Sequence, residues 1–238
     1  MRKDIPSLDI VEIDLTNKCN FMCRHCRANA KNKEYHELEY NLLLKTIDEL
    51  IDMDVPTIVL AGGEPLLYPK IIEFVNYIVS NGSEAHVTTN GYFHSTLQAL
   101  IDNVENPELL RVAVSIYGPE RYHDEFCDVQ GAYNKAIKSL ELCIEHGIIT
   151  TVNFTITREN IRYVFDYLNM AENMKANVFK VRTPNPIGRA TISKNILLST
   201  DEWFNILSKL VNEKEKRNIE IEFADPLWGD LTKNLSVH

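Results

Sequence analysis

Three cysteines within eight residues form the part of the sequence best suited to chemistry. Cys19, Cys23 and Cys26 have the spacing C-x3-C-x2-C and directly follow a predicted strand. Thiolates on one short loop can hold a corner of a [4Fe–4S] cluster, which normally takes four cysteine ligands. Three protein ligands leave one iron with an open coordination position, which is where a metal centre can carry out chemistry.

A structural zinc site is the alternative use of these cysteines. Zinc prefers four ligands, and His25 lies too close in the chain to two of the cysteines to serve as a clean fourth. Cys127 and Cys143 lie far downstream, and nothing in the sequence places them near the loop. We predict that Cys143 lies in the core on a helix and that Cys127 is an incidental thiol in a loop.

Strand-like runs alternate with longer helical patterns along the whole chain. The predicted strands are 8–15, 57–60, 84–88, 111–116, 149–156, 177–183 and 219–223. The predicted helices are 37–52, 68–81, 94–104, 130–146, 160–174 and 200–217. This order implies βαβ units and a parallel sheet. Because no linker or internal repeat interrupts it, we treat residues 1–238 as a single domain.

The strands have one apolar and one polar face. In the first strand, Val11 and Ile13 alternate with Glu12 and Asp14. A parallel sheet covered by helices on both faces would instead consist of continuous apolar runs. The apolar face needs a layer of helices to cover it, and the polar face needs water or a cavity. A barrel with an outer helix layer and a polar lumen meets both needs. The predicted fold is therefore an α/β, partial (β/α)6 TIM-type barrel with a polar lumen and the cysteine loop after its first strand.

Several further motifs lie at predicted strand ends, in a fixed order. They are Ala61-Gly62-Gly63-Glu64-Pro65, Thr89-Asn90-Gly91, Ser115-Ile116-Tyr117-Gly118 followed by His123-Asp124, and Pro186-Ile187-Gly188-Arg189-Ala190. Together with the cysteines they resemble the radical S-adenosylmethionine (radical SAM) superfamily, through its GGEP, TNG and GRA-type motifs. The resemblance is to members that often carry a SPASM extension. Because no cysteine-rich segment follows Asp225, we expect the core without an auxiliary-cluster domain.

The resemblance implies two cofactors: a [4Fe–4S] cluster on the three loop cysteines, and SAM, whose amine and carboxylate chelate the open iron. Gly62 and Gly63 would let the backbone approach SAM closely, and Glu64 would accept from its ammonium group. A plain β-to-α turn is the alternative for this segment. The residues that we expect to bind the cofactor are His25, Gly62, Gly63, Glu64, Pro65, Ser115, Asn153 and Arg182.

The predicted lumen also offers groups for a substrate. Glu12 and Asp14 face inward if the first strand alternates as its pattern predicts, and carboxylates suit a cationic or N–H-rich ligand. The alternative is that the inward carboxylates, which include Glu222, only pair with Arg182, Lys180 or water. The expected substrate-binding residues are Glu12, Asp14, Asn90, Tyr117 and Asp225. The pattern identifies no catalytic residue.

The resemblance implies that SAM is reductively cleaved to methionine and a 5′-deoxyadenosyl radical, which takes hydrogen from a substrate. We expect a small-molecule substrate such as a 7-deazaguanine base, with C–N cleavage of the queuine lyase type. A peptide-modifying maturase is the alternative. A non-catalytic iron–sulfur electron carrier or sensor is another, but the segment 62–65 would then have no purpose. The reaction would be of the lyase or oxidoreductase type.

Composition limits the partners. The 238 residues carry a net charge of −9, which disfavours nucleic acid. No apolar run approaches the ~20 residues of a membrane span, and no secretory signal follows the basic start. We therefore expect a cytoplasmic enzyme with no membrane partner. The expected partners are a small-molecule substrate and an external electron donor such as flavodoxin or ferredoxin.

Overall fold

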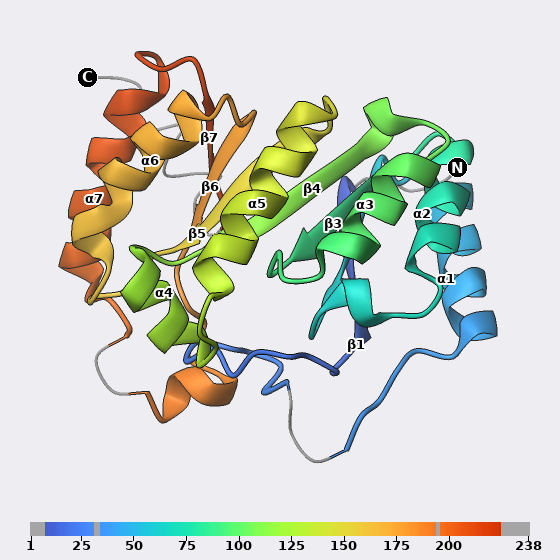
Figure 1. The fold of residues 1–238 in the computed structure, drawn as a ribbon, viewed down its shortest axis with the longest axis horizontal. Coiled ribbons are helices and arrows are strands. Elements are labelled where there is room, and N and C mark those ends of the chain that lie inside the picture. Colours follow the sequence, from blue (N-terminus) through green and yellow to red (C-terminus); the bar gives the residue numbers. More distant parts are fainter. Residues whose placement is uncertain (1–7, 31–33, 194–195, 225–238) are drawn as a thin grey trace, which may run out of the picture.

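The computed structural model describes residues 8–30, 34–193 and 196–224, and its centre is one parallel sheet (Figure 1). The strands are β1 (Ile10–Thr16), β2 (Thr57–Gly62), β3 (Glu84–Thr89), β4 (Leu110–Ile116), β5 (Ile149–Thr155), β6 (Val178–Arg182) and β7 (Glu220–Phe223). They lie side by side in chain order, and each neighbouring pair is parallel. Within the described residues β1 and β7 are free edges, so the sheet is a partial barrel, as predicted.

Helices pack against the outer face of this sheet (Figure 1). They are α1 (Tyr40–Asp52), α2 (Ile71–Ser80), α3 (His94–Asn103), α4 (Glu120–Cys127), α5 (Ala132–Glu145), α6 (Val164–Asn173) and α7 (Thr200–Lys214). Alternate strand residues such as Val112 and Val114 on β4 join helix residues such as Leu140 on α5 in one continuous core. The apolar residues at alternate strand positions therefore face the helix layer, as the sequence predicts.

Helix α4 was not predicted, because its stretch has only eight residues and few of them are apolar. Its buried residues are His123, Phe126 and Cys127, and it ends at Asp128, whose φ of 57° is left-handed. The Asp124 carboxylate then accepts hydrogen bonds from the first backbone amides of the next helix, as at Gly131 N (2.6 Å). The expected loop around Cys127 is thus a helix end, and Asp124 connects it to α5.

The inner face of the sheet is polar, as predicted, and two ion pairs connect neighbouring strands across it. Arg111 on β4 forms a two-pronged ion pair with Glu84 on β3, with distances of 2.7 and 2.8 Å. Lys180 on β6 lies 2.9 Å from Glu222 on β7. Ion pairs toward the lumen let the sheet hold charged side chains without leaving them unpaired.

Residues 17–30 form the cysteine loop, which follows β1 and crosses the carboxyl ends of the strands. In parallel α/β proteins these ends are where ligand sites form. No helix among the described residues is long and apolar enough to cross a membrane.

Candidate functional site

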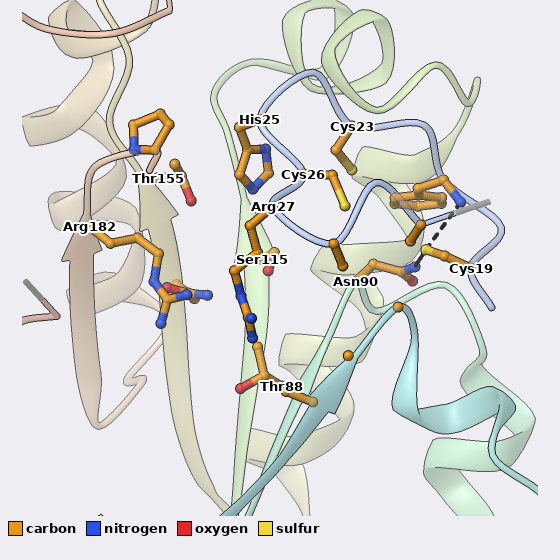
Figure 2. Close-up of a pocket in the computed structure, with 18 of the residues that line it drawn as sticks. Cys19, Cys23, His25, Cys26, Arg27, Thr88, Asn90, Ser115, Thr155 and Arg182 are labelled. Carbon is orange, nitrogen blue, oxygen red and sulfur yellow. Dashed lines mark hydrogen bonds between the residues drawn. The ribbon is translucent and has the colours of Figure 1, made fainter. Parts of the chain in front are cut away.

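A pocket lies between the cysteine loop and the strand ends, and Cys19, Cys23 and Cys26 all line it (Figure 2). The loop is held to the end of α4 by two backbone hydrogen bonds. Met22 N donates to Cys127 O at 2.9 Å, and Arg24 N donates to Phe126 O at 3.1 Å. A helix that the sequence did not indicate therefore supports one side of the loop.

Cys127 is consequently not remote from the loop, which corrects the sequence-based expectation. Its side chain is fully buried, and a hydrogen bond between the Cys127 and Cys23 thiols is the main cause that lowers the pKa of Cys23. Burial raises the pKa of Cys127 well above its ordinary value. Cys143 lies in the core on α5, as predicted, and burial raises its pKa to about 12.

Gly62 and Gly63 line the pocket, but their lack of a side chain serves the protein backbone first. A Cβ on Gly63 would fall 2.8 Å from the carbonyl carbon of Asn17 and closer still to Lys18 O. Gly62 has a φ of 123°, and a Cβ there would fall 2.5 Å from Thr16 O. The glycines therefore allow β2 to approach the cysteine loop, whereas the motif alone indicated only that they make room for SAM.

Glu64, the expected ammonium acceptor, is not among the residues that line the pocket. Its carboxylate is fully buried and accepts from Thr89 Oγ1 (2.6 Å), Asn90 N (2.8 Å) and Leu66 N (3.2 Å). Burial raises the pKa of this carboxyl to about 7, against these hydrogen bonds, which lower it. Glu64 thus joins the turn after β3 to the turn after β2. Pro65 begins a short 3-10 helix there and is buried.

Asn90, which we expect to bind substrate, lines the pocket and also contacts the cysteine loop. Its side-chain amide donates to Asn20 Oδ1 at 2.8 Å and lies 3.9 Å from Cys19 Sγ (Figure 2). A donor beside a cluster ligand helps to orient the thiolate. The placement links the β3 turn to the first cysteine.

Buried polar atoms without a partner lie around the same pocket. Among the described residues, Asn153 Oδ1, Arg182 Nε and His25 Nδ1 are buried without a hydrogen bond, and all three residues line the pocket. Unpaired buried polar atoms are costly unless a ligand completes them. A ligand with donors, acceptors and a carboxylate, as SAM has, would complete them. The residues present therefore fit the cofactor that the resemblance implies.

An aromatic group forms the wall beside Cys23 and Cys26. The His25 ring stacks on Phe126 with centroids 5.2 Å apart and lies 5.0 Å from the Tyr117 ring. Burial, and then the positive charges of Arg182 and Arg189, lower the pKa of His25 to about 3, so its imidazole is neutral. Ser115 and Tyr117 line the pocket as well. This wall suits a flat, uncharged group such as a nucleobase.

The carboxylates of Glu12 and Asp14 point to the lumen side but pair with a residue that the sequence patterns did not indicate. Arg27, in the cysteine loop, forms ion pairs with Glu12 and with Asp14, the latter at 2.9 Å. Arg27 therefore replaces Arg182, the partner named in the alternative for these two carboxylates. Glu222 pairs with Lys180, one of the partners that the alternative offers. All three side chains of the Arg27 group are about two-fifths exposed. The remaining predicted substrate residue, Asp225, lies outside the described residues.

The described residues contain no group of three or more His, Cys, Asp or Glu side chains gathered around one metal ion.

Comparison with known proteins gives the family. The sequence pattern described as the Radical SAM superfamily matches residues 13–171. An AdoMet-dependent heme synthase of Oleidesulfovibrio alaskensis is 27% identical over 205 residues, covering 85% of this chain and 52% of that protein. An Fe-coproporphyrin III synthase of Methanosarcina barkeri is 30% identical over 167 residues, covering 70% of this chain and 41% of that protein.

Solved structures share the fold. Streptococcus suis SuiB bound to S-adenosylmethionine has a TM-score of 0.73 and 16% identity, over 91% of this chain and 50% of that chain. SuiB bound to the precursor peptide SuiA has a TM-score of 0.74, over 91% and 49%. The chain spans about half the length of the curated relatives it matches.

The fold is that of the solved radical SAM enzymes above, and the family match covers residues 13–171, so the chain belongs to the radical SAM superfamily. The family uses a [4Fe–4S] cluster and SAM.

Proposed function

We propose that Cys19, Cys23 and Cys26 hold a [4Fe–4S] cluster and that SAM binds beside it in the pocket, so that the enzyme abstracts hydrogen from a substrate. The observation that carries this proposal is the convergence of the three cysteines with three unpartnered buried polar atoms on one pocket. When bound, the cofactors supply an electron and a 5′-deoxyadenosyl radical. An external reductant provides the electron.

The residues of this chain bind and orient. Arg182 offers a cation for the SAM carboxylate, and Asn153 offers an amide for a hydroxyl or amine of the cofactor. The neutral His25 and Tyr117 rings cover the adenine side and exclude water. Gly62 and Gly63 also line the pocket, and we propose their backbone carbonyls as acceptors for the SAM ammonium group.

Anaerobic reconstitution with iron and sulfide tests the proposal. We expect about one [4Fe–4S] cluster per chain, since only one three-cysteine loop is present. With dithionite and SAM the protein should release 5′-deoxyadenosine. Alanine at any loop cysteine should abolish both, whereas Cys143→Ala, which removes a core thiol, should change neither. Iron retained after all three loop cysteines are replaced would refute the assignment.

For the substrate, we propose a small molecule with an amine or N–H-rich edge, such as a 7-deazaguanine base. Support comes from Glu12, Asp14 and Arg27, where two carboxylates meet one guanidinium and leave one negative charge over. The two carboxylates lie on β1, at the open edge of the sheet, and Arg27 reaches them from the cysteine loop, so all three can exchange partners with a ligand.

Asp14→Asn keeps the side-chain shape and removes the charge. It should leave SAM binding near normal and raise the release of 5′-deoxyadenosine uncoupled from product. Glu222→Gln, which changes a carboxylate paired with Lys180, is the control and should leave the ratio of product to 5′-deoxyadenosine unchanged. A lower melting temperature with an unchanged ratio for Asp14→Asn would make these carboxylates purely structural.

A peptide substrate is the second candidate. SuiB, which shares the fold, has been solved bound to a precursor peptide. Cell extract separated by size into metabolite and peptide fractions distinguishes the two. The reconstituted enzyme should deplete a compound of the metabolite fraction under the first proposal. Depletion confined to the peptide fraction would replace it with the second.

A further inference from the structure

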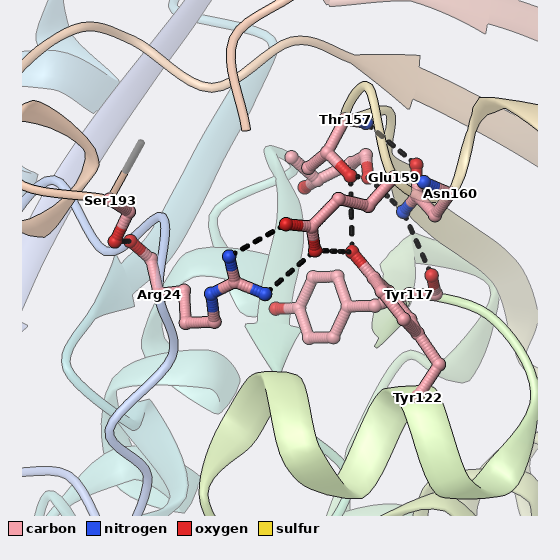
Figure 3. Close-up of polar contacts among 8 residues, drawn as sticks. Arg24, Tyr117, Tyr122, Thr157, Glu159, Asn160 and Ser193 are labelled. Atoms are coloured by element: carbon pink, nitrogen blue, oxygen red, sulfur yellow. Dashed lines mark hydrogen bonds and ion pairs between the residues drawn. The ribbon is translucent and has the colours of Figure 1, made fainter. Parts of the chain in front are cut away.

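The segment after β6 is a second part of the chain that contacts the cysteine loop. Gly188 has a φ of 58°, and a Cβ there would fall 2.5 Å from Arg27 O. The backbone amide of Arg189 donates to Cys26 O at 3.0 Å. Ser193 Oγ donates to Arg24 O at 3.0 Å (Figure 3). A stretch more than 150 residues downstream therefore follows the loop backbone closely.

The Arg189 side chain holds three further points of the same loop. Its Nε donates to Cys23 O at 2.8 Å, and its Nη1 donates to Ala30 O at 2.6 Å and to Asn29 Oδ1 at 3.2 Å. Together with its amide, one residue thus binds the carbonyls of two proposed cluster ligands. The planar fork of an arginine is suited to such fixed, divergent acceptors, which a lysine cannot match.

Arg24, in the cysteine loop, and Arg189, which binds that loop, differ in whether a carboxylate neutralises their charge. Arg24 forms a two-pronged ion pair with Glu159 at 2.7 and 2.8 Å, which Tyr122 supports with a hydrogen bond of 3.3 Å (Figure 3). Within the described residues, the acceptors of the Arg189 side chain are uncharged carbonyl oxygens. The Arg24 charge is therefore neutralised locally, while the Arg189 charge has no paired carboxylate there.

We propose that Arg189 is a positioning residue that shapes the cysteine loop for its cluster and places an unneutralised positive charge beside it. Reduction adds one negative charge to a cluster, and a nearby cation stabilises that state. Arg189 thereby makes the cluster easier to reduce. The inference rests on the proposed function, since it takes the loop cysteines as the ligands.

Three variants separate shape from charge. R189Q removes both the guanidinium hydrogen bonds and the positive charge. R189K keeps the charge but cannot form the same set of hydrogen bonds. The double variant R24Q/E159Q is the matched control, because it removes an anchor of the same loop without changing the net charge. All are reconstituted anaerobically, and the reduction midpoint is measured by titration with electron paramagnetic resonance.

For R189Q we expect a midpoint more negative by about 59 mV, which is a tenfold fall in the reduced-to-oxidised ratio for one electron. R189K and R24Q/E159Q should stay near the wild-type midpoint. In the cluster-free proteins, hydrogen exchange over residues 19–30 should be faster for R189Q and R189K than for the wild type. These cluster-free data remain informative if R189Q assembles no cluster.

A midpoint for R189Q equal to that of the wild type, or a shift of the same size in R24Q/E159Q, would overturn the role of the charge. Unchanged hydrogen exchange of the loop in R189Q would overturn the role in shaping it. Failure of the underlying proposal looks different, because the wild-type protein itself would then form no cluster.

Discussion

At the scale of single residues, Gly63 occupies the tightest point between β2 and the cysteine loop. A methyl group there would overlap Lys18 O and the adjoining Asn17 carbonyl carbon, which are backbone atoms that cannot rotate away. Gly63→Ala should therefore displace the loop and lower both the iron content after reconstitution and SAM binding. The sequence alone would have predicted a loss of SAM binding with the cluster intact.

Gly82→Ala is the matched control for this prediction. Gly82 has a φ of 88°, but no atom lies within 4 Å of the point that a Cβ would occupy, so the change adds backbone strain without a clash. It should cost about 1 kcal/mol of stability and leave the iron content unchanged. Full iron content in Gly63→Ala, with normal SAM affinity by calorimetry, would contradict the close approach described for this glycine.

Residue spacing predicted the cysteine loop, but it could not predict the side chains that support that loop. Arg27, Arg189 and Cys127 reach the loop through the tertiary fold, and their distance along the chain carries no signal of this. Glu64 was recognised from its motif, yet its burial depends on how two turns pack together. Motif resemblance thus located the site, while the direction of each side chain needed the structure.

At the scale of elements, the turns after β2 and β3 are held together by one carboxylate. All three groups that Glu64 contacts are donors, so it serves only as an acceptor. Glu64→Gln would place an amide NH2 opposite a backbone or hydroxyl donor. We expect a loss of about 1–3 kcal/mol in the free energy of unfolding, measured by denaturant titration of the cluster-free protein.

The exposed Glu73 provides the comparison for that variant. Its carboxylate pairs with Lys70 and Tyr40 at the protein surface. Glu73→Gln should change stability far less, because water replaces the lost contacts. Equal losses for the two variants would mean that the Glu64 carboxylate does not hold the turns.

The elements also differ in how well their patterns predicted them. The seven strands lie within a few residues of their expected ranges, because one-sided apolar alternation is a strong signal for a sheet that faces a lumen. Helix α4 was missed, since its buried face consists of His123, Phe126 and Cys127 in an otherwise charged stretch. So short and polar a helix depends on tertiary contacts for its stability.

At the scale of the whole molecule, buried histidines make stability depend on pH. His86 and His123 each have one ring nitrogen buried without a partner, and burial lowers the pKa of both to about 4. The unfolded chain binds protons at such residues near pH 6.5, so it holds more protons than the folded protein between about pH 4 and pH 6.5. The stability that these neutral histidines contribute to the folded protein is therefore fully present above pH 6.5 and is lost as the pH falls toward 4.

Glu64 acts in the opposite direction over part of this range. Its pKa is raised to about 7, so the folded protein takes up a proton there as the pH falls, and stability rises. The pH dependence of the wild type alone therefore mixes both effects. A variant at one histidine, compared with the wild type at each pH, isolates the contribution of that histidine.

His123 is the suitable position, because its side chain is fully buried and its Nδ1 accepts from Tyr117 N at 3.3 Å. His123→Asn retains an acceptor near that nitrogen and removes the titrating ring. At pH 7.5 the variant should be less stable than the wild type. Between pH 6.5 and pH 5 the difference in unfolding free energy should shrink by about 2 kcal/mol, because only the wild type must keep an imidazole neutral.

His123→Ala separates this titration from packing. It leaves Tyr117 N without its acceptor and opens a cavity, so it should be less stable than His123→Asn at every pH. Its difference from the wild type should nevertheless shrink by the same amount over the same pH range, since both variants lack the imidazole. A difference that stays constant from pH 7.5 to pH 5 in both variants would mean that burial of His123 does not disfavour its protonated form.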